Sequence, residues 1–538
     1  MKRTSTLLAA FALSAFAGVS EAQAQTRYLD EVFTDAEITV VPDQVYGINF
    51  FAYAPGSIGG PQLLPLYMDV YMPNPAVDTS SSRPVVIYLH TGSFLPKGLA
   101  SPMGERTDSA AVEACKRLAR MGYVAISATY RVGWLANSTN LDLRRGTNLL
   151  AVYNAVQDVK ACVRANRGLA FTTNPFEINP DHIALIGQGS GGYITMAYAS
   201  LSDLSEITTP SKFQYSASGT GLFGNAVNAG DPYVDTAIVG DWNGYGGEVT
   251  LTGNTTPLGL PEIDLTATGR NYVNTPGIPD DVSLCLNMGG ALGDSAWYEG
   301  GETPVVSAHC RYDFFAPYYR GMVQVPVSGQ FFPVVEVAGS HTMVKMAENN
   351  GNNGFFANAN FNDPISQVAR NNPFNLGQYG QLLTFNIPPV NPALPFQVNS
   401  NPWDWWDPAD PLSVNETNPN IKSQSMLYID TVMGFFVPRI AYAFKQNGLN
   451  VPGLSVNDPA NDRLWSLYPN PARTYFVLST PGALIERVEV MDLGGKILKV
   501  QSGTSSEVQV SVEGLKPGIY LVAVQTNQGK GVRRLSVR

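Results

Sequence analysis

The stretch HIALIGQGSGGY, from His182 to Tyr193, joins a run of apolar residues to a glycine-rich turn. The apolar half predicts a buried parallel strand, because a strand covered on both faces is hydrophobic along its whole length. The turn GQGSGG contains four glycines, which accept the positive φ angles of a sharp bend. We therefore expect a buried strand that ends abruptly at this turn.

Apolar runs on both sides of this stretch predict further strands. Upstream, the runs begin at Arg83 (RPVVIYLHTG) and Tyr123 (YVAISATYR), and apolar residues recur at helical spacing after each of them. Downstream, three more runs begin at Val282 (VSLCLNMGGAL), Thr303 (TPVVSAH) and Phe332 (FPVVEVAGSH). Strands that alternate with helices indicate an α/β fold with a doubly wound, mostly parallel sheet.

Two long irregular stretches interrupt this alternation. Residues 205–279 are rich in Gly, Asn and Thr, and residues 348–422 are rich in Asn, Pro and aromatic residues. We expect both to be lid-like insertions, since long irregular segments beside strand ends usually form lids or binding walls. The second contains PWDWWDP (Pro402 to Pro408), whose tryptophans we expect to pack the insertion onto the body. Stacking on a sugar or another flat ligand is the alternative.

The amino-terminal residues have the pattern of an export signal. Lys2 and Arg3 precede a short apolar run, which ends at the small residues of AQA. This pattern predicts a secretory signal peptide over residues 1–24. The mature body then begins at residue 25.

The carboxyl-terminal part changes in composition. An apolar stretch that contains Pro438 predicts a last helix for the body, which we place at residues 25–446. Residues 447–463 have the composition of a linker. Residues 464–538 alternate in short runs separated by turns, which is typical of a small all-β, immunoglobulin-like sandwich.

The charge of the chain limits its partners. It has 538 residues with 34 Lys or Arg and 44 Asp or Glu, so its formal net charge is −10. We expect no nucleic-acid partner, because an acidic protein repels phosphate groups. No apolar run approaches the roughly 20 residues of a membrane-spanning helix, so we expect no membrane span.

Four motifs near the carboxyl end occur in order: LYPNPARTYFVL, VEVMDLGGKIL, LKPGIYLVAV and GVRRLSVR. Together they resemble the C-terminal sorting domain of type IX secretion cargo. The resemblance implies that the type IX secretion machinery recognises this domain. It also implies export through the periplasm to a secreted or cell-surface location.

The body resembles the α/β-hydrolase fold. VVIYLHTGSF is similar to the loop that supplies an oxyanion-hole N–H, and ALIGQGSGGY to the nucleophile elbow. VVSAHCRYDFFAPY is similar to the acid loop and VEVAGSH to the loop of the catalytic histidine. The resemblance implies a carboxylic-ester hydrolase of the esterase or lipase kind, which acts on a small-molecule or polymer ester.

The same resemblance assigns roles to individual residues. Asp313 and His341 follow consecutive predicted strands, which would bring them together above the sheet. Ser190 would be the nucleophile, His341 the general base and Asp313 the acid that orients it. The expected oxyanion-hole donors are the backbone N–H groups of Thr91, Gly92, Ser93 and Gly191. Asp313 as a loop cap and His341 as a buried hydrogen-bonded residue are the structural alternatives.

The elbow departs from the family pattern. In GQGSGG the G-x-S-x-G frame set by Gly187 and Gly191 places Gly189 at the nucleophile position, and Ser190 comes one residue late. A glycine-rich turn can shift register and present Ser190 instead. Two hypotheses follow: an ester hydrolase that uses Ser190, or a degenerate hydrolase fold that binds a ligand or surface polymer. A hydrolase with Ser340 or Ser93 as nucleophile is a third.

The topology of that fold also bears on Cys115, Cys162, Cys285 and Cys310, which permit two disulfides in an exported protein. The helices that carry Cys115 and Cys162 would cross to opposite faces of the sheet, so we expect no disulfide between these two. The cysteines and the four histidines lack the spacing of a metal site. We expect no metal and no cofactor.

Overall fold

The computed structural model describes twelve segments of the chain. These are residues 26–52, 61–99, 101–327, 330–359, 361–375, 380–396, 398–405, 420–451, 466–480, 483–492, 496–527 and 529–538. The predicted signal peptide and most of the predicted linker lie outside the described residues.

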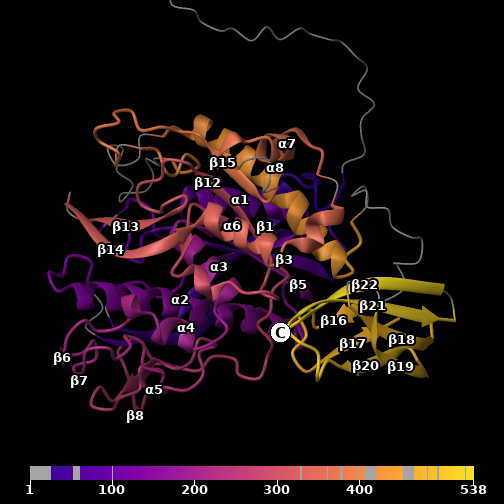
Figure 1. Ribbon diagram of the computed structural model, residues 1–538, viewed down its shortest axis with the longest axis horizontal. Helices are drawn as coiled ribbons and strands as arrows, with labels where there is room; N and C mark the ends of the chain where they lie inside the picture. The colour runs from indigo at the N-terminus through magenta and orange to yellow at the C-terminus, as the bar shows by residue number, and fades with distance from the viewer. Residues whose placement is uncertain are drawn as a thin grey trace, which may run out of the picture.

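One eight-stranded sheet forms the centre of the body, in the order β1-β2-β4-β3-β5-β10-β12-β15 (Figure 1). β2 is antiparallel to β1 and β4, whereas the strands from β4 to β15 are parallel to their neighbours. The mostly parallel sheet of an α/β fold, which the sequence predicted, is therefore confirmed. The strands are β1 (Ile38–Phe51), β2 (Gln62–Pro73), β3 (Arg83–Leu89), β4 (Val124–Ala128), β5 (Ile178–Gln188), β10 (Leu284–Met288), β12 (Val305–Cys310) and β15 (Leu382–Phe385).

Helices cover both faces of this sheet. α2 (Leu141–Ala170) and α3 (Ser190–Ser200) pack on one face, and α1 (Ser109–Arg120) and α8 (Lys422–Gln446) pack on the other. In Figure 1, α8 lies above the sheet and α2 below it. The side chains of β3 alternate between the two cores, because successive residues of a strand point to opposite faces.

The four cysteines are all free and buried. Cys162 belongs to the core under α2, and Cys115 belongs to the core under α1, on the opposite face of the sheet. The prediction that these two do not pair is therefore confirmed. Buried among apolar side chains, all four behave as small hydrophobic residues.

The sequence misplaced the last strand of the main sheet. FPVVEVAGSH forms β14 (Gln330–Gly339), which pairs with β13 (Arg320–Val327) and β11 (Ala291–Leu292) in a separate three-stranded sheet. The last strand of the main sheet is β15, within the range predicted to be an insertion. β15 has only four residues, LLTF, so its sequence signal is short, whereas the longer β14 is half exposed.

The tryptophans that follow β15 pack against the body. Trp403 is fully buried and Trp405 is 6% exposed, so both are core residues and the packing expectation holds for them. Trp406 lies outside the described residues.

Short elements complete the described part of the body. They are η1 (Asp35–Glu37), α4 (Ser205–Thr208), η2 (Ser211–Phe213), β6 (Gly219–Thr220), β7 (Ala226–Val227), α5 (Thr236–Val239), β8 (Leu251–Thr255), β9 (Pro261–Ile263), η3 (Ser295–Trp297), α6 (Ser340–Asn349), η4 (Gly354–Asn358), α7 (Pro364–Arg370) and η5 (Pro373–Asn375).

The carboxyl-terminal residues form two all-β sheets, in the orders β16-β17-β20 and β19-β18-β21-β22, around their own apolar core. The Arg538 side chain donates to Thr303 of the body. The strands are β16 (Ser466–Tyr468), β17 (Tyr475–Ser479), β18 (Ile485–Met491), β19 (Ile497–Ser505), β20 (Glu507–Ser511), β21 (Gly518–Thr526) and β22 (Gly529–Val537).

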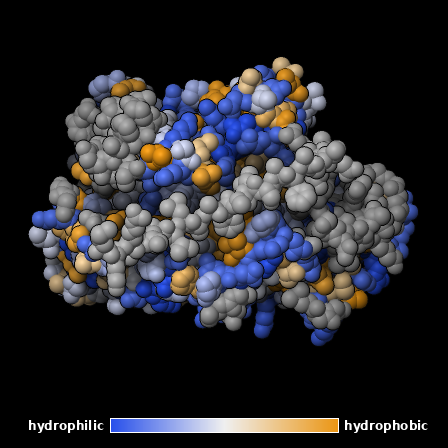
Figure 2. All heavy atoms as spheres, turned by 90° about the horizontal axis from the view of Figure 1, so that it is seen from above, coloured by the Kyte–Doolittle hydropathy of each residue, from blue (hydrophilic) through white to orange (hydrophobic). Residues whose placement is uncertain are grey.

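Helix α8 is long and apolar enough to cross a membrane by length and composition alone. Two thirds of its most apolar window, 67%, is buried inside the body, where Phe435, Phe436 and Phe444 are fully enclosed. That burial is typical of a core helix. In the view of Figure 2, the coloured surface is mainly hydrophilic, with small hydrophobic groups scattered over it.

Candidate functional site

The turn between β5 and α3 has the sharp conformation that the glycines predict. Gly189 has φ 54° and ψ −112°, a positive-φ conformation that residues with a side chain rarely adopt and only with strain. Its N–H donates to the carbonyl oxygen of Met288 over 2.8 Å, which ties the turn to β10. Gly189 thus stands between the strand and the helix, where a nucleophile elbow carries its reactive side chain.

The space beside Gly189 is already filled by Thr91. A Cβ atom added to Gly189 would lie 2.1 Å from Thr91 Oγ1 and 3.0 Å from Thr91 Cβ. Both distances are shorter than a normal contact, so a serine at position 189 requires Thr91 to move. The Thr91 hydroxyl occupies the place where a nucleophile at 189 would start.

The Ser190 hydroxyl faces a tyrosine. Ser190 is 3% exposed, and its Oγ lies 2.9 Å from the hydroxyl of Tyr130. Tyr130 donates its single proton to the carbonyl oxygen of His90 over 2.7 Å, so Ser190 is the donor in the pair. Burial raises the pKa of Tyr130, so the phenol stays protonated and does not act as a base for Ser190.

The predicted oxyanion residues divide into two groups. Thr91 and Ser93 border the cavity described below, in a loop where Gly92, Ser93 and Phe94 all have positive φ. The bonds that hold this loop include those from Trp134 Nε1 to the Ser93 carbonyl and from the Gly133 N–H to the Phe94 carbonyl. The Gly191 N–H is committed elsewhere, because it donates to the His90 carbonyl over 3.1 Å.

Asp313 mainly caps its own loop. Its Oδ1 accepts from the backbone N–H groups of Phe315 and Ala316 over 2.8 and 3.0 Å. The imidazole beside it belongs to His309, whose Nε2 lies 3.5 Å from Asp313 Oδ2. Asp313 also borders the cavity, so the predicted acid does reach the site.

His341 is placed differently. Its ring packs on the rings of Tyr319 and Tyr318, at centroid distances of 4.6 and 5.6 Å. Its backbone N–H donates to the Tyr318 carbonyl. Burial, Lys345 and Arg311 together lower the pKa of His341. It is not among the residues that line the cavity. The structure therefore brings Ser190 and Asp313 to one cavity and leaves His341 outside its lining.

The other three histidines are also engaged elsewhere. His309 Nδ1 lies 2.5 Å from Ser340 Oγ, and its Nε2 bonds to the Ala316 carbonyl. His90 Nδ1 bonds to the Thr91 carbonyl, and the ring stacks on Tyr130. His182 packs edge-on against Phe444 of α8. The structure describes every histidine of the chain, and none of the four lines the cavity.

Sequence reasoning missed a buried carboxylate beneath the elbow. Asp404 is 3% exposed, and both of its oxygens accept from Gln188 Nε2 over 2.7 and 2.8 Å. Tyr88 in turn donates to Gln188 Oε1. Burial raises the pKa of Asp404 to about 7. Asp404 lies within PWDWWDP, and nothing in that sequence distinguishes this aspartate from an exposed one.

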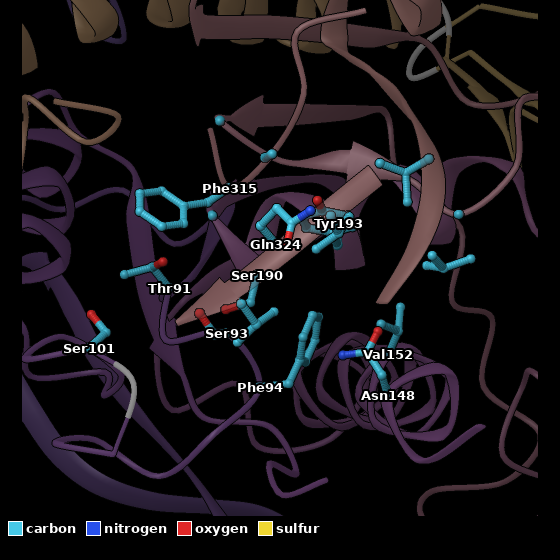
Figure 3. A pocket seen from close by; sticks show the side chains of 18 of the residues that line it. Thr91, Ser93, Phe94, Ser101, Asn148, Val152, Ser190, Tyr193, Phe315 and Gln324 are labelled. Carbon is cyan, nitrogen blue, oxygen red and sulfur yellow. The ribbon is translucent and has the colours of Figure 1, made fainter. Parts of the chain in front are cut away.

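A cavity of about 580 Å³ lies above the elbow, which is a typical size for a small-molecule site (Figure 3). Thr91, Ser93, Ser190 and Tyr193 are among the residues that line it. Apolar residues of α2, α3 and the β13–β14 hairpin form much of the remaining wall, among them Val152, Ala197, Val325 and Val337. Within the described residues, no group of three His, Cys, Asp or Glu side chains is placed to hold a metal ion.

Solved structures with some likeness to this chain include several esterases. Thermogutta terrifontis esterase 2 phosphorylated by paraoxon is 15% identical over 53% of this chain and 75% of its own, with a TM-score of 0.26. The native form of that esterase is 14% identical over 53% and 74%, with a TM-score of 0.27. Esterase B from Lactobacillus rhamnosis is 18% identical over 32% and 44%, with a TM-score of 0.21. Likenesses at these scores carry no argument about activity.

No curated protein matches the chain. Residues 466–538 match a protein family described as a secretion system C-terminal sorting domain. The match begins where β16 begins and covers both carboxyl-terminal sheets. The chain thus ends in the type IX sorting domain that its four motifs predict, and this domain directs it to the cell surface or the medium.

Proposed function

We propose that this exported protein uses its α/β-hydrolase-like body to bind a small apolar ligand without hydrolysing it. One observation carries the proposal: Thr91 fills the space beside Gly189, at the point where the elbow of a hydrolase carries its nucleophile. The cavity above the elbow is open to a ligand of ordinary size. A binding protein needs that cavity but does not need a nucleophilic side chain at position 189.

The surroundings of Ser190 also favour binding over hydrolysis. Acyl transfer by a serine requires a base that takes its proton as the hydroxyl attacks. The Ser190 proton is directed to a protonated phenol, and every imidazole of the chain is placed off the cavity lining. Loss of such a nucleophile–base pair typically lowers turnover about a millionfold.

Carboxylic-ester hydrolysis by Ser190, Asp313 and His341 is the second candidate. It is favoured by the position of Ser190 and Asp313 on one cavity, and by the strained loop from Gly92 to Phe94 beside them. Such strain often accompanies functional sites. In this mechanism the ring of His341 has to leave Tyr319 and enter the cavity, with a small-molecule or polymer ester as substrate.

One set of assays separates the two candidates. The full mature chain is incubated with p-nitrophenyl butyrate and with a fluorophosphonate probe, beside Ser190→Ala and His341→Ala. We expect neither p-nitrophenol release above the buffer rate nor labelling of any form. Turnover that disappears in both variants establishes the hydrolase and contradicts the binding proposal.

Binding itself is tested with Nile red, an uncharged apolar dye. We expect its fluorescence to rise on addition of the protein and to return to the buffer value in Val152→Phe, which fills the cavity from α2. Val152 is partly exposed to the cavity, so the larger side chain has room without disturbing the core. An unchanged signal in Val152→Phe places the dye elsewhere and contradicts the proposal.

We further propose that the two carboxyl-terminal sheets pack as an immunoglobulin-like sandwich and that this sandwich is the part bound by the type IX secretion machinery. Its separate apolar core supports this, because such a core lets residues 466–538 fold as a unit. Export of a reporter protein fused to residues 447–538 tests the assignment, and retention of that fusion in the periplasm contradicts it.

A further inference from the structure

Two buried hydroxyl groups on the cavity have no hydrogen-bond partner among the described residues. Ser400 is 4% exposed, and its Oγ contacts no donor or acceptor in the described part of the chain. The Tyr193 hydroxyl oxygen is likewise buried and unpaired. Both residues line the cavity.

Unpaired buried hydroxyls are costly, so they call for an explanation. Most buried polar atoms in folded proteins have at least one partner, because a buried polar atom without one has lost its bonds to water and gained none in return. Each hydroxyl here has a proton to donate and lone pairs to accept with. An oxygen atom of a ligand in the cavity would satisfy both.

Tyr193 and Ser400 line the cavity from different elements near the elbow. Tyr193 lies in the first turn of α3, three residues after Ser190. Ser400 lies in the segment that carries Trp403. A Cβ atom added at Gly289, directly after β10, would lie 3.5 Å from the Trp403 ring and 3.8 Å from Asp313 Oδ2, so both side chains lie next to Gly289. The segment of Ser400 and the loop of Asp313 therefore meet beside the elbow.

The charge that acts on the Tyr193 hydroxyl is the negative charge of Asp313, which disfavours an anion beside that hydroxyl. Burial and the negative charge of Asp313 both raise the pKa of Tyr193, so Asp313 acts directly on the phenol. Two cations also line the cavity, but both donate to carbonyl groups of β14, Arg145 to that of Val334 and Lys212 to that of Glu336. Lys212 is further paired with Asp294 over 2.9 Å.

We propose that the Tyr193 and Ser400 hydroxyls bind an uncharged oxygen of an apolar ligand, such as the carbonyl oxygen of a ketone or intact ester, in preference to a carboxylate. The inference rests on the proposed function and names the ligand class of the same cavity. The apolar remainder of the ligand lies against the walls that α2, α3 and the β13–β14 hairpin supply. A ketone with a chain of about seven carbons suits the volume of this cavity and contains no bond that can be hydrolysed.

The test compares heptan-2-one with heptanoate at pH 8 by isothermal titration calorimetry on the full mature chain. We expect heptan-2-one to bind at least tenfold more tightly than heptanoate. Tyr193→Phe and Ser400→Ala should each weaken heptan-2-one binding about fivefold, which is the effect of one lost hydrogen bond. The control is Tyr123→Phe, because Tyr123 is a buried tyrosine outside the cavity lining whose hydroxyl donates to the Tyr28 carbonyl. It should leave binding unchanged.

Two sets of outcomes separate this inference from the proposed function. Equal binding of heptanoate, no binding of heptan-2-one, or an unchanged affinity in both Tyr193→Phe and Ser400→Ala overturns the inference. Heptan-2-one binding that persists in Val152→Phe shows that the ligand lies outside the cavity and overturns the proposed function as well. Equal melting temperatures of the variants and the parent exclude misfolding as the cause of any loss.

Discussion

The elbow after β5 and the cluster beside β12 each have one of the two features that acyl transfer by a serine requires. The elbow has the sharp backbone at Gly189 but no side chain on it. The cluster has the side chains of a serine, a histidine and an aspartate, Ser340, His309 and Asp313, in contact with one another. Ser340 and His309 are fully buried, however, so no substrate reaches them. The sharp backbone turn and the three interacting side chains thus lie at two different places in this molecule.

The comparison explains why a resemblance in sequence order is a weak guide to activity. A nucleophile, an acid and a histidine in the right chain order require only that strands end in the right sequence. Catalysis further requires that their side chains meet at an open surface. Here Ser340 and His309 meet but are fully buried, and Ser190 on the cavity does not meet a base.

The largest expected effect comes from breaking the buried cluster. His309→Ala leaves a cavity and removes the partner of the Ser340 hydroxyl, so we expect the free energy of unfolding to fall by about 3–4 kcal/mol. Denaturant unfolding followed by circular dichroism measures it. The matched control is the half-buried His341, whose replacement by alanine should cost less than about 1 kcal/mol. Equal losses of unfolding free energy in the two variants would contradict this structural role of His309.

The next effect comes from adding a side chain at the elbow. Gly189→Ala meets Thr91 Oγ1 at 2.1 Å and also strains a backbone with φ 54°, so we expect a loss of about 2–3 kcal/mol. The double variant Gly189→Ala with Thr91→Gly should recover about 1 kcal/mol, because only the backbone strain remains. Thermal unfolding of the four proteins in the cycle measures the coupling. Additive losses would contradict the steric role given to Thr91.

The carboxylate beneath the elbow predicts a pH dependence. The pKa of Asp404 is about 7 in the folded protein, above that of an unfolded aspartate, so its contribution to stability is fully present below about pH 4. That contribution is lost as the pH rises to about 7, at up to about 1.4 kcal/mol per pH unit. Asp108 adds to the upward shift and Lys97 opposes it. Asp404→Asn should remove this part of the slope, as denaturant unfolding between pH 4 and 8 would show. Parallel curves for the two proteins would mean that Asp404 is already ionised at pH 4.

Much of the fold was readable because it depends on long apolar runs. The strands that contain Val86, Ile126 and Ile186 are continuously hydrophobic, and the structure places all three in the parallel part of the sheet. β15 was missed because four residues carry too little pattern, and β14 was assigned to the wrong sheet because its run resembles a buried strand. The length of an apolar run predicts a strand but not the strands with which it pairs.

The site was less readable because it depends on contacts between distant residues. That Gly189 stands at the nucleophile position follows from the GQGSGG frame alone. That Thr91 fills the space beside it, or that Asp313 lies next to His309 and not His341, depends on how loops from different strands meet. A single sequence fixes the order of such loops along the chain but not the direction in which each side chain points.

The smallest expected effect concerns the pair formed by Ser190 and Tyr130. Tyr130→Phe removes the acceptor of the Ser190 proton, so we expect a loss of about 1 kcal/mol in unfolding free energy and no gain of esterase activity. Tyr123→Phe is a matched control, since Tyr123 is a buried tyrosine whose hydroxyl bonds to the Tyr28 carbonyl far from the elbow. Release of p-nitrophenol in Tyr130→Phe but not in Tyr123→Phe would mean that Ser190, once freed, finds a base. In that case the phenol, and not the lack of a base near Ser190, is what keeps the elbow inactive.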